Sequence, residues 1–280
     1  MPIKPWKDLT IRDDYMFKLV MRNKRICRRM LEMILRVPIR DIRYLEEEKS
    51  ISPRYDSKGI RLDVYAEGED TVYEVEMQVR QVGTEELAKR TRYYQSVIDQ
   101  DMLKTGYSYK RLKLTIIIFI CPFDPFGQGR HLYTFRNLCK EDPSLEMGDG
   151  TAKVFLNTKG TMDDVPADVK AFCGYVNGIA SEDGLVQEIE KEVQSLKYIE
   201  KEEVSYMTYA MKLEEAHEDG IRQGIEQGTD STMMDCLKTA MRKLHLSAEE
   251  AMDMFDVPAG NRDKYAKMLQ PAISRKQSMP

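Results

Sequence analysis

The sequence is poor in the residues that build disulfides, zinc sites and histidine-based catalytic sites. Its five cysteines are widely scattered and show no CxxC pairing, and its three histidines lie far apart from one another. An odd number of unpaired cysteines argues against a disulfide framework and against a zinc site. We therefore expect reduced thiols, as in a cytoplasmic protein, and assign no catalytic role to histidine.

Long apolar runs and an excess of basic residues are also missing. The longest apolar run, from Thr115 to Cys121, is far too short to cross a membrane, and the N-terminal stretch has no apolar leader core. These absences predict a soluble, cytoplasmic protein with no membrane partner. The formal net charge of -4 gives no global basic field that would indicate nucleic acid, although a local patch is sufficient for binding.

The pattern of apolar residues in the N-terminal part alternates between helical and extended periods. Helical spacing predicts helices over 12–22, 24–36 and 84–103. Alternating or continuously β-branched stretches predict strands over 39–51, 60–66, 71–79, 114–121 and 152–157. A helix that crosses between strands is typical of an α/β fold, here with a mixed central sheet flanked by helices.

The composition changes after about residue 180, where the chain becomes charged, free of proline and poor in β-formers. This change predicts exposed helices, and the capping box that begins at Ser247 predicts a short helix near the end. We divide the chain into a core domain over 1–180, a charged helical segment over 181–232 and a small helical module over 233–280. The module has the outline of a helix-turn-helix, but it lacks a basic recognition face.

Small residues recur every four positions in the charged segment, at Ala216, Gly220, Gly224 and Gly228. Each glycine costs a helix roughly 1 kcal/mol relative to alanine, so the repeat needs an explanation. One explanation is the close approach of a second helix, which predicts a homodimer or a helical hairpin. A flexible spacer is the alternative.

A predicted hairpin carries the main candidates for chemistry. A two-residue period places Glu74, Glu76 and Gln78 on one face of its second strand, and Asp63 lies on its first strand. Carboxylates on neighbouring strands, with the Met77 main-chain carbonyl between them, suit a hard divalent cation such as Mg²⁺ or Mn²⁺. Such a site would activate water against a phosphodiester. The alternative is an antiparallel pair whose polar face meets water.

Further polar residues lie on the helices that flank this hairpin. Asp14 opens the first helix, where the helix dipole alone explains an acid, or where it is an accessory to the metal site. Arg90 and Gln95 lie on the helix after the hairpin and are candidates for phosphate contact, while Tyr94 fits the core equally well. The basic residues of 89–92 and 109–113 form a phosphate-binding rim or an ordinary solvated surface.

These motifs, taken in order, resemble the PD-(D/E)xK nuclease superfamily, and in particular the Rpn family of recombination-promoting nucleases. The resemblance rests on an Asp on one strand, Glu-x-Gln on the next and RxRYYQ on the following helix. The stretches DDYMFKLVM, KTGYSYKRLKLTIIIFI and GIRQGIEQG also look like this family. It covers roughly residues 10–270 and implies a restriction-endonuclease-like core with a C-terminal helical extension.

The same resemblance implies an activity and the roles of several residues. It implies a Mg-dependent DNA endonuclease, linked to recombination, mobile elements or phage defence, in which Asp63 and Glu76 hold the metal with the Met77 carbonyl. Gln78 occupies the position where the superfamily pattern has lysine, and Leu62 stands where proline would precede the first acid. Glutamine supplies only dipoles where lysine supplies a charge. Arg80 or Arg90 would then have to compensate.

Two other functions fit the sequence. One is a catalytically inactive nuclease fold that serves as a DNA-binding or oligomerising module, which the glutamine at position 78 favours. The other is a helical scaffold whose function resides in the C-terminal half, unrelated to nucleic acid.

Overall fold

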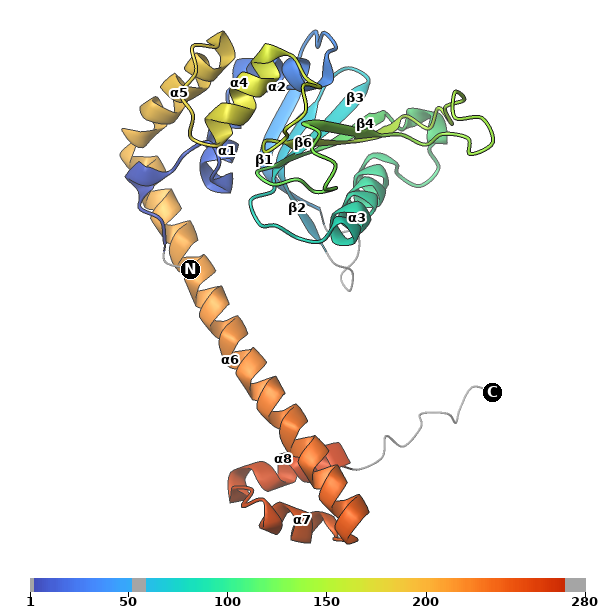
Figure 1. Ribbon diagram of the computed structural model, residues 1–280, viewed down its shortest axis with the longest axis vertical. Helices are drawn as coiled ribbons and strands as arrows, with labels where there is room; N and C mark the ends of the chain where they lie inside the picture. Colours follow the sequence, from blue (N-terminus) through green and yellow to red (C-terminus); the bar gives the residue numbers. More distant parts are fainter. Residues whose placement is uncertain (1–2, 52–58, 270–280) are drawn as a thin grey trace. The chain divides into compact units, whose positions relative to one another are not determined.

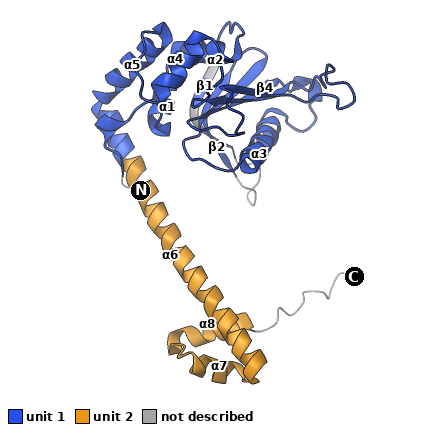
Figure 2. Ribbon diagram, viewed as in Figure 1, with its two compact units in different colours: residues 1–207 blue, residues 208–280 orange. Residues whose placement is uncertain are grey.

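The computed structural model describes residues 3–51 and 59–269, which form two compact units. The first unit spans residues 1–207 and the second spans residues 208–280 (Figure 2). The boundary falls inside one long helix, α6 (Glu200–Leu244). Each unit is described by itself below.

A mixed β-sheet forms the centre of the first unit (Figure 1). Among the described residues its six strands run in the order β1-β2-β3-β4-β6-β5, with the bounds β1 (Tyr44–Ile51), β2 (Ile60–Glu67), β3 (Thr71–Met77), β4 (Leu114–Cys121), β5 (Leu132–Phe135) and β6 (Thr151–Asn157). Strands β1, β2 and β3 are antiparallel neighbours, whereas β3, β4 and β6 are parallel. Strand β5 is antiparallel to β6 at the edge. The predicted mixed α/β sheet is confirmed.

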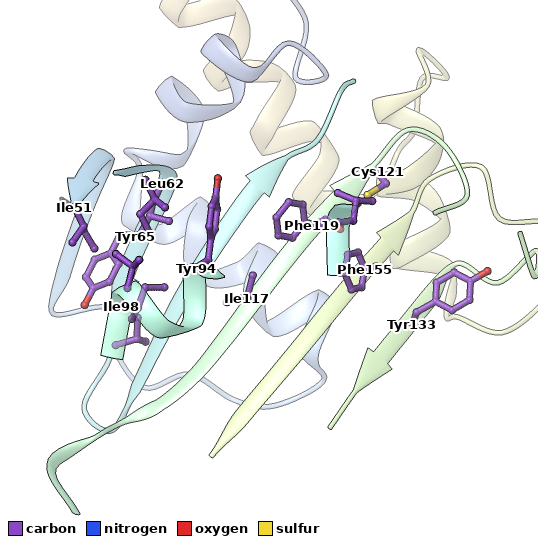
Figure 3. Close-up of a cluster of buried hydrophobic side chains, with 14 of the residues drawn as sticks. Ile51, Leu62, Tyr65, Tyr94, Ile98, Ile117, Phe119, Cys121, Tyr133 and Phe155 are labelled. Carbon is purple, nitrogen blue, oxygen red and sulfur yellow. Dashed lines mark hydrogen bonds between the residues drawn. The ribbon is translucent and has the colours of Figure 1, made fainter. Parts of the chain in front are cut away.

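Helices cover both faces of this sheet, as Figures 1 and 3 show. One face carries α3 (Thr84–Met102), which connects β3 to the parallel strand β4. The other face carries α1 (Asp14–Met21) and α2 (Lys24–Leu35), together with α4 (Ala167–Val176) and α5 (Gly184–Lys197). The arrangement matches the predicted restriction-endonuclease-like core.

The core between α3 and the sheet is built from large apolar side chains (Figure 3). Tyr94 and Ile98 of α3 pack over Ile117 and Phe119 of β4, and the Phe119 ring stacks on Phe155 of β6 with centroids 5.7 Å apart. Because β4 is apolar on both faces, its other side chains meet the opposite helical layer. A strand of this kind has to be central, and β4 lies between β3 and β6.

One strand and one α-helix among the described residues of the first unit were not predicted from the sequence. Strand β5 has four residues, two of them exposed, so it shows no clear apolar alternation. Its pairing with β6 is what makes it a strand. Helix α4 begins directly after Pro166 and has no side-chain cap, so its start carries no capping signal.

The second unit is helical, as predicted for the C-terminal extension. It contains the greater part of α6, then α7 (Ala248–Met254) and α8 (Ala259–Leu269). The predicted capping box is confirmed: the Ser247 hydroxyl accepts from the Glu250 N–H, and the Glu250 carboxylate accepts from the Ser247 N–H. Fully buried Leu237 of α6 lies in the cluster that joins the three helices.

The domain boundaries predicted at residues 180 and 232 stay predictions. Helix α5 contacts α1, α2 and α4, so residues 184–197 pack with the core. Residues 270–280 of the predicted C-terminal module lie outside the described residues. Within the described ranges, none of the helices has the length and apolar character needed to span a membrane.

Candidate active site

The polar side chains of β3 point into the protein rather than into water. Glu74, Glu76 and Gln78 are 0%, 4% and 6% exposed, respectively. The parallel register with β4 sets Glu74 beside Ile117 and Glu76 beside Phe119, both apolar and fully buried. The alternative of a solvated hairpin face is therefore wrong, and the energetic cost of burying these carboxyl groups requires compensation.

Asp63 of β2 lies where the pairing of β2 with β3 ends. The paired residues run from Glu67 opposite Val72 to Val64 opposite Val75. Just beyond the last pair, the Asp63 carboxylate accepts a hydrogen bond from the Met77 N–H at 3.3 Å. Only 8% of Asp63 is exposed. This hydrogen bond joins the side chain of the first acid, on β2, to the backbone directly after the second acid, on β3.

Arg90 of α3 ties the second acid to the glutamine. Its guanidinium donates to Glu76 at 2.8 Å, to the Gln78 side-chain oxygen at 2.6 Å and to the Tyr94 hydroxyl at 2.9 Å. The four-residue spacing of Arg90 and Tyr94 places both on one face of α3. The planar cation also lies 5.3 Å from the Phe119 ring centre. Both polar groups of the Glu-x-Gln motif are thus held by one side chain.

Electrostatics in this cluster favour protonated acids when no metal balances them. Burial, opposed by the charge of Lys18, raises the pKa of Asp63 to about 6. Burial and then the charge of Asp63 raise the pKa of Glu76 to about 8, with Arg90 opposing. Burial, followed by the neighbouring Glu76, raises the pKa of Glu74 well above its usual range. The charge of Asp63 contributes to both glutamate shifts, so ionisation of Asp63 disfavours ionisation of Glu74 and Glu76.

The structure brings some of the predicted accessory residues to the cluster. Asp14 of α1 is in an ion pair with Lys18, its Oδ2 3.8 Å from Nζ, and its charge contributes to the raised pKa of Asp63. Gln95, in contrast, donates its side-chain amide to Asp99 at 2.9 Å, one turn along α3. Asp14 is therefore beside the acids, whereas the Gln95 amide is engaged elsewhere.

Sequence reasoning missed Lys18, which is 2% exposed. Its Nζ lies 3.7 Å from Oδ1 of Asp63, and α1 contacts β2, the strand that carries this acid. The signal in the sequence is a lysine between the apolar residues Phe17 and Leu19, on the stripe that a core-facing helix buries. A buried lysine has to be paired, and its partner is the first acid.

The donor set fits a hard divalent cation. Apart from a hydrogen bond between the Glu74 and Glu76 carboxyl groups themselves, no donor among the described residues reaches Glu76 Oε1 or either oxygen of Glu74, although all three atoms are buried. Buried carboxylate oxygens without a donor suit an oxygen-seeking cation. The described part of the chain has no group of three His, Cys, Asp or Glu side chains arranged as a metal cage. The residues predicted to hold a metal are Asp63, Glu76 and the Met77 carbonyl, and this carbonyl accepts from the Val79 N–H at 3.0 Å.

A cavity of about 700 Å³ opens beside the cluster between β2 and α3. Arg90 and Tyr94 line it, so the side chain that holds Glu76 and Gln78 also forms part of the cavity wall. Arg61 and Lys89 add positive charge to the wall, and Glu85 forms an ion pair with Lys89. Glu86 is a second acid in the wall, and Asp63, Glu74 and Glu76 do not line the cavity themselves.

Comparison with known proteins agrees with this geometry. No curated protein and no solved structure matches the chain. A family model described as PD-(D/E)XK nuclease family transposase matches residues 11–157, just over half of the sequence. The matched region begins before α1 and ends with β6, so it contains both acids, Gln78 and Arg90. The chain therefore belongs to the PD-(D/E)XK nuclease family transposases, a family of nucleases.

Proposed function

We propose that this protein is a DNA endonuclease that hydrolyses phosphodiester bonds with a divalent metal, Mg²⁺ or Mn²⁺. Its site consists of Asp63, Glu76 and Gln78. The observation that carries the proposal is the pair of buried acids on β2 and β3, one of which, Glu76, keeps a buried oxygen without a donor. Family membership supports nuclease chemistry. The transposase description of the family supports a role in mobile-element movement, and we extend the proposal to recombination or phage defence.

Each residue of the site has a separate task. Asp63 and Glu76, with the Met77 carbonyl, would hold the metal. When bound, the metal supplies charge stabilisation to the scissile phosphate and lowers the pKa of a water molecule. Arg90 keeps the Glu76 carboxylate and the Gln78 amide in fixed orientations, which reduces the reorganisation needed during reaction.

The basic side chains around the neighbouring cavity support DNA as the substrate. Arg61, Lys89 and Arg90 line it, and they outnumber the two acids in its wall, Glu85 and Glu86. Contacts to the phosphate backbone would position DNA without reading its sequence. The net charge of the whole chain is negative, so such contacts have to be local.

A catalytically inactive DNA-binding or oligomerising module is the second candidate, and Gln78 favours it. The Gln78 amide accepts from Arg90 and donates to the Arg80 carbonyl, so it brings no positive charge to the acids. The oligomerising role would use α6, where Gly220, Gly224 and Gly228 form an exposed strip. We propose a homodimer formed through this strip in either case.

The nicking of supercoiled plasmid DNA tests the proposal. The full-length protein is incubated with plasmid and Mg²⁺ or with EDTA, beside an Asp63→Asn variant that keeps the size of the side chain. Glu69→Gln is the matched control, because it removes one acid from the exposed turn of the same hairpin. We expect metal-dependent nicking by the wild type and the control, and a loss of roughly a thousandfold or more in Asp63→Asn.

The two candidates give different outcomes in this assay. Equal nicking by wild type and Asp63→Asn would show that another protein is responsible. No nicking by a folded wild-type protein that still binds DNA would support the inactive module. Titration with Mn²⁺ adds an independent measurement, since Asp63→Asn should weaken binding whether or not DNA is cut.

A further inference from the structure

A buried lysine on α1 contacts the first acid, whereas Arg90 of α3 contacts the second. The Lys18 ammonium lies 3.7 Å from Asp63 and 3.8 Å from Asp14, which precedes it by one helical turn. Both separations are longer than an ordinary hydrogen bond, so the contacts to these two carboxylates are ion pairs. Only 3% of the Lys18 side chain is exposed, which makes its charge strong in this low-dielectric setting.

The charge of Lys18 acts on both acids of the proposed metal site. It opposes the rise that burial causes in the pKa of Asp63, and it also opposes the rise that burial and Asp63 cause in the pKa of Glu76. The geometry agrees, because the ammonium contacts Asp63 and the Asp63 carboxylate accepts from the Met77 N–H directly after Glu76. Helix α1 contacts β1, β2 and β3, so the position of Lys18 is fixed by the packing of the helix on the sheet.

Other cationic side chains near the site are less suited to this position. Arg90 is held by three hydrogen bonds, to Glu76, Gln78 and Tyr94. Arg80 follows β3 and is exposed. Gln78 is neutral, and its amide is engaged on both sides. Lys18 is the buried lysine that the structure places against the first acid.

We propose that Lys18 provides, from helix α1, the positive charge that the nuclease pattern otherwise takes from a lysine at position 78. This inference rests on the proposed function. As a positioning residue, Lys18 fixes the orientation of the Asp63 carboxylate through the ion pair. Its charge also offsets the negative charge that increases on the phosphate during hydrolysis. The arrangement explains how a family member with glutamine in the motif retains a lysine at its site.

Relocation of the charge tests the proposal in the full-length protein. Lys18→Met removes the charge and keeps an unbranched side chain, and a double variant adds Gln78→Lys to it. We expect Lys18→Met to lower kcat for plasmid nicking about a hundredfold with little change in KM. The double variant should recover at least about tenfold of this loss, since it returns a charge to the site. Lys24→Met is the matched control, because Lys24 is exposed at the start of α2.

Binding of Mn²⁺ separates a charge effect from a structural one. Loss of a cation beside Asp63 removes repulsion, so Lys18→Met should bind Mn²⁺ as tightly as the wild type or severalfold more tightly while cutting DNA more slowly. A structural role would weaken binding and cleavage together. If Lys18→Met does not fold, Lys18→Gln, which keeps a polar head group, takes its place.

Several results would overturn the proposal. One is wild-type kcat in a folded Lys18→Met protein. Another is a double variant that binds Mn²⁺ normally but stays as slow as Lys18→Met. In both cases the wild type still cuts DNA, and the proposed function stands. A folded wild type that binds Mn²⁺ and does not cut DNA would instead overturn the proposed function, and the inference with it.

Discussion

Arg90 of α3 and Glu76 of β3 form an ion pair with Nη2 2.8 Å from Oε2, and Glu76 is almost fully buried. The pair joins the helix that crosses the sheet to the strand that carries the Glu-x-Gln motif. Buried ion pairs of this kind contribute little net stability but are costly to break on one side. Their value here is that the second acid is held in one orientation.

Loss of Arg90 should slow cleavage and move its pH dependence. Arg90 lowers the pKa of Glu76, so Arg90→Gln should raise that pKa further and shift the acid limb of the pH–rate profile to higher pH. We expect a drop in kcat of about a hundredfold at neutral pH. Arg92→Gln, on the exposed side of α3, is the control. A slower enzyme with an unshifted profile would contradict the role of Arg90 beside Glu76.

Replacement of Glu74 by leucine should stabilise the protein. The side chain is fully buried, and apart from its hydrogen bond with the Glu76 carboxyl group no donor among the described residues reaches its oxygens. Removing a buried carboxyl group without a donor should raise the free energy of unfolding by about 1–3 kcal/mol, measured by urea denaturation. Cleavage should stay within about tenfold of the wild type, since Glu76 is the proposed ligand. A loss as large as that in Asp63→Asn would instead make Glu74 a ligand.

Stability in EDTA should fall as the pH rises. Asp63 and Glu76 have folded-state pKa values of about 6 and about 8, raised by burial from 3.8 and 4.5. A raised acid pKa stabilises the fold fully below the unfolded-state value, and this contribution is lost as pH rises through the folded-state value. A shift of two pKa units corresponds to roughly 3 kcal/mol, although the coupling of the two acids makes their effects less than additive.

Thermal melting between about pH 4 and pH 8 measures this loss. The groups that face the two acids are Lys18, Asp14, Arg61, Arg90 and Glu74. Mg²⁺ should raise Tm more at the alkaline end, because ionised carboxylates bind it better. Glu76→Gln should flatten the curve. A Tm that rises with pH in EDTA would show that these acids do not control stability.

Substitution of the α6 glycines by alanine should have opposite effects on the stability of the helix and on self-association of the protein. A Cβ added at Gly220, Gly224 or Gly228 would meet nothing within 4 Å in the single chain. Alanine at all three positions should stabilise the helix by about 0.5–1 kcal/mol per site and weaken a homodimer that needs close approach. Circular dichroism melts and sedimentation equilibrium measure the two effects, with exposed Glu215→Ala as the control. Unchanged association would contradict the proposed dimer.

Damage to the core of the second unit should leave cleavage intact. Leu237 is 0% exposed in the cluster that joins α6, α7 and α8. Leu237→Ala should destabilise this unit by about 2–5 kcal/mol, detected as faster proteolysis after residue 208, while plasmid nicking per molecule stays constant. Leu244→Ala, at a position 53% exposed, should have little effect. Loss of nicking in Leu237→Ala would favour a function that resides in the C-terminal half.

Local pattern was sufficient to predict much of the fold. The strand over 114–121 was predicted with the bounds that β4 has, since a continuous β-branched run suits a strand buried on both faces. The long helix, α3, was predicted within one residue of its bounds by its apolar stripe. Strand β5 was not predicted, because only its partner β6 gives it regular hydrogen bonds.

The residue types and the order of the motif also pointed to Asp63, Glu76 and Gln78 as a group. A two-residue period showed that Glu76 and Gln78 share a face of the strand, but the period alone did not distinguish a solvent-exposed face from a buried one. Burial depends on what covers the strand, and α3 supplies that cover from elsewhere in the chain. The link from Arg90 to both motif residues depends on the same packing.

By itself, the sequence determined the kinds of element, the acids and the neutral residue at position 78. The tertiary structure decided how that neutral residue is compensated. Lys18 precedes Asp63 by more than forty positions, and nothing local in the sequence connects them. Their 3.7 Å contact exists because α1 packs across β2, and a buried lysine and a buried aspartate are each stabilised by the other's charge.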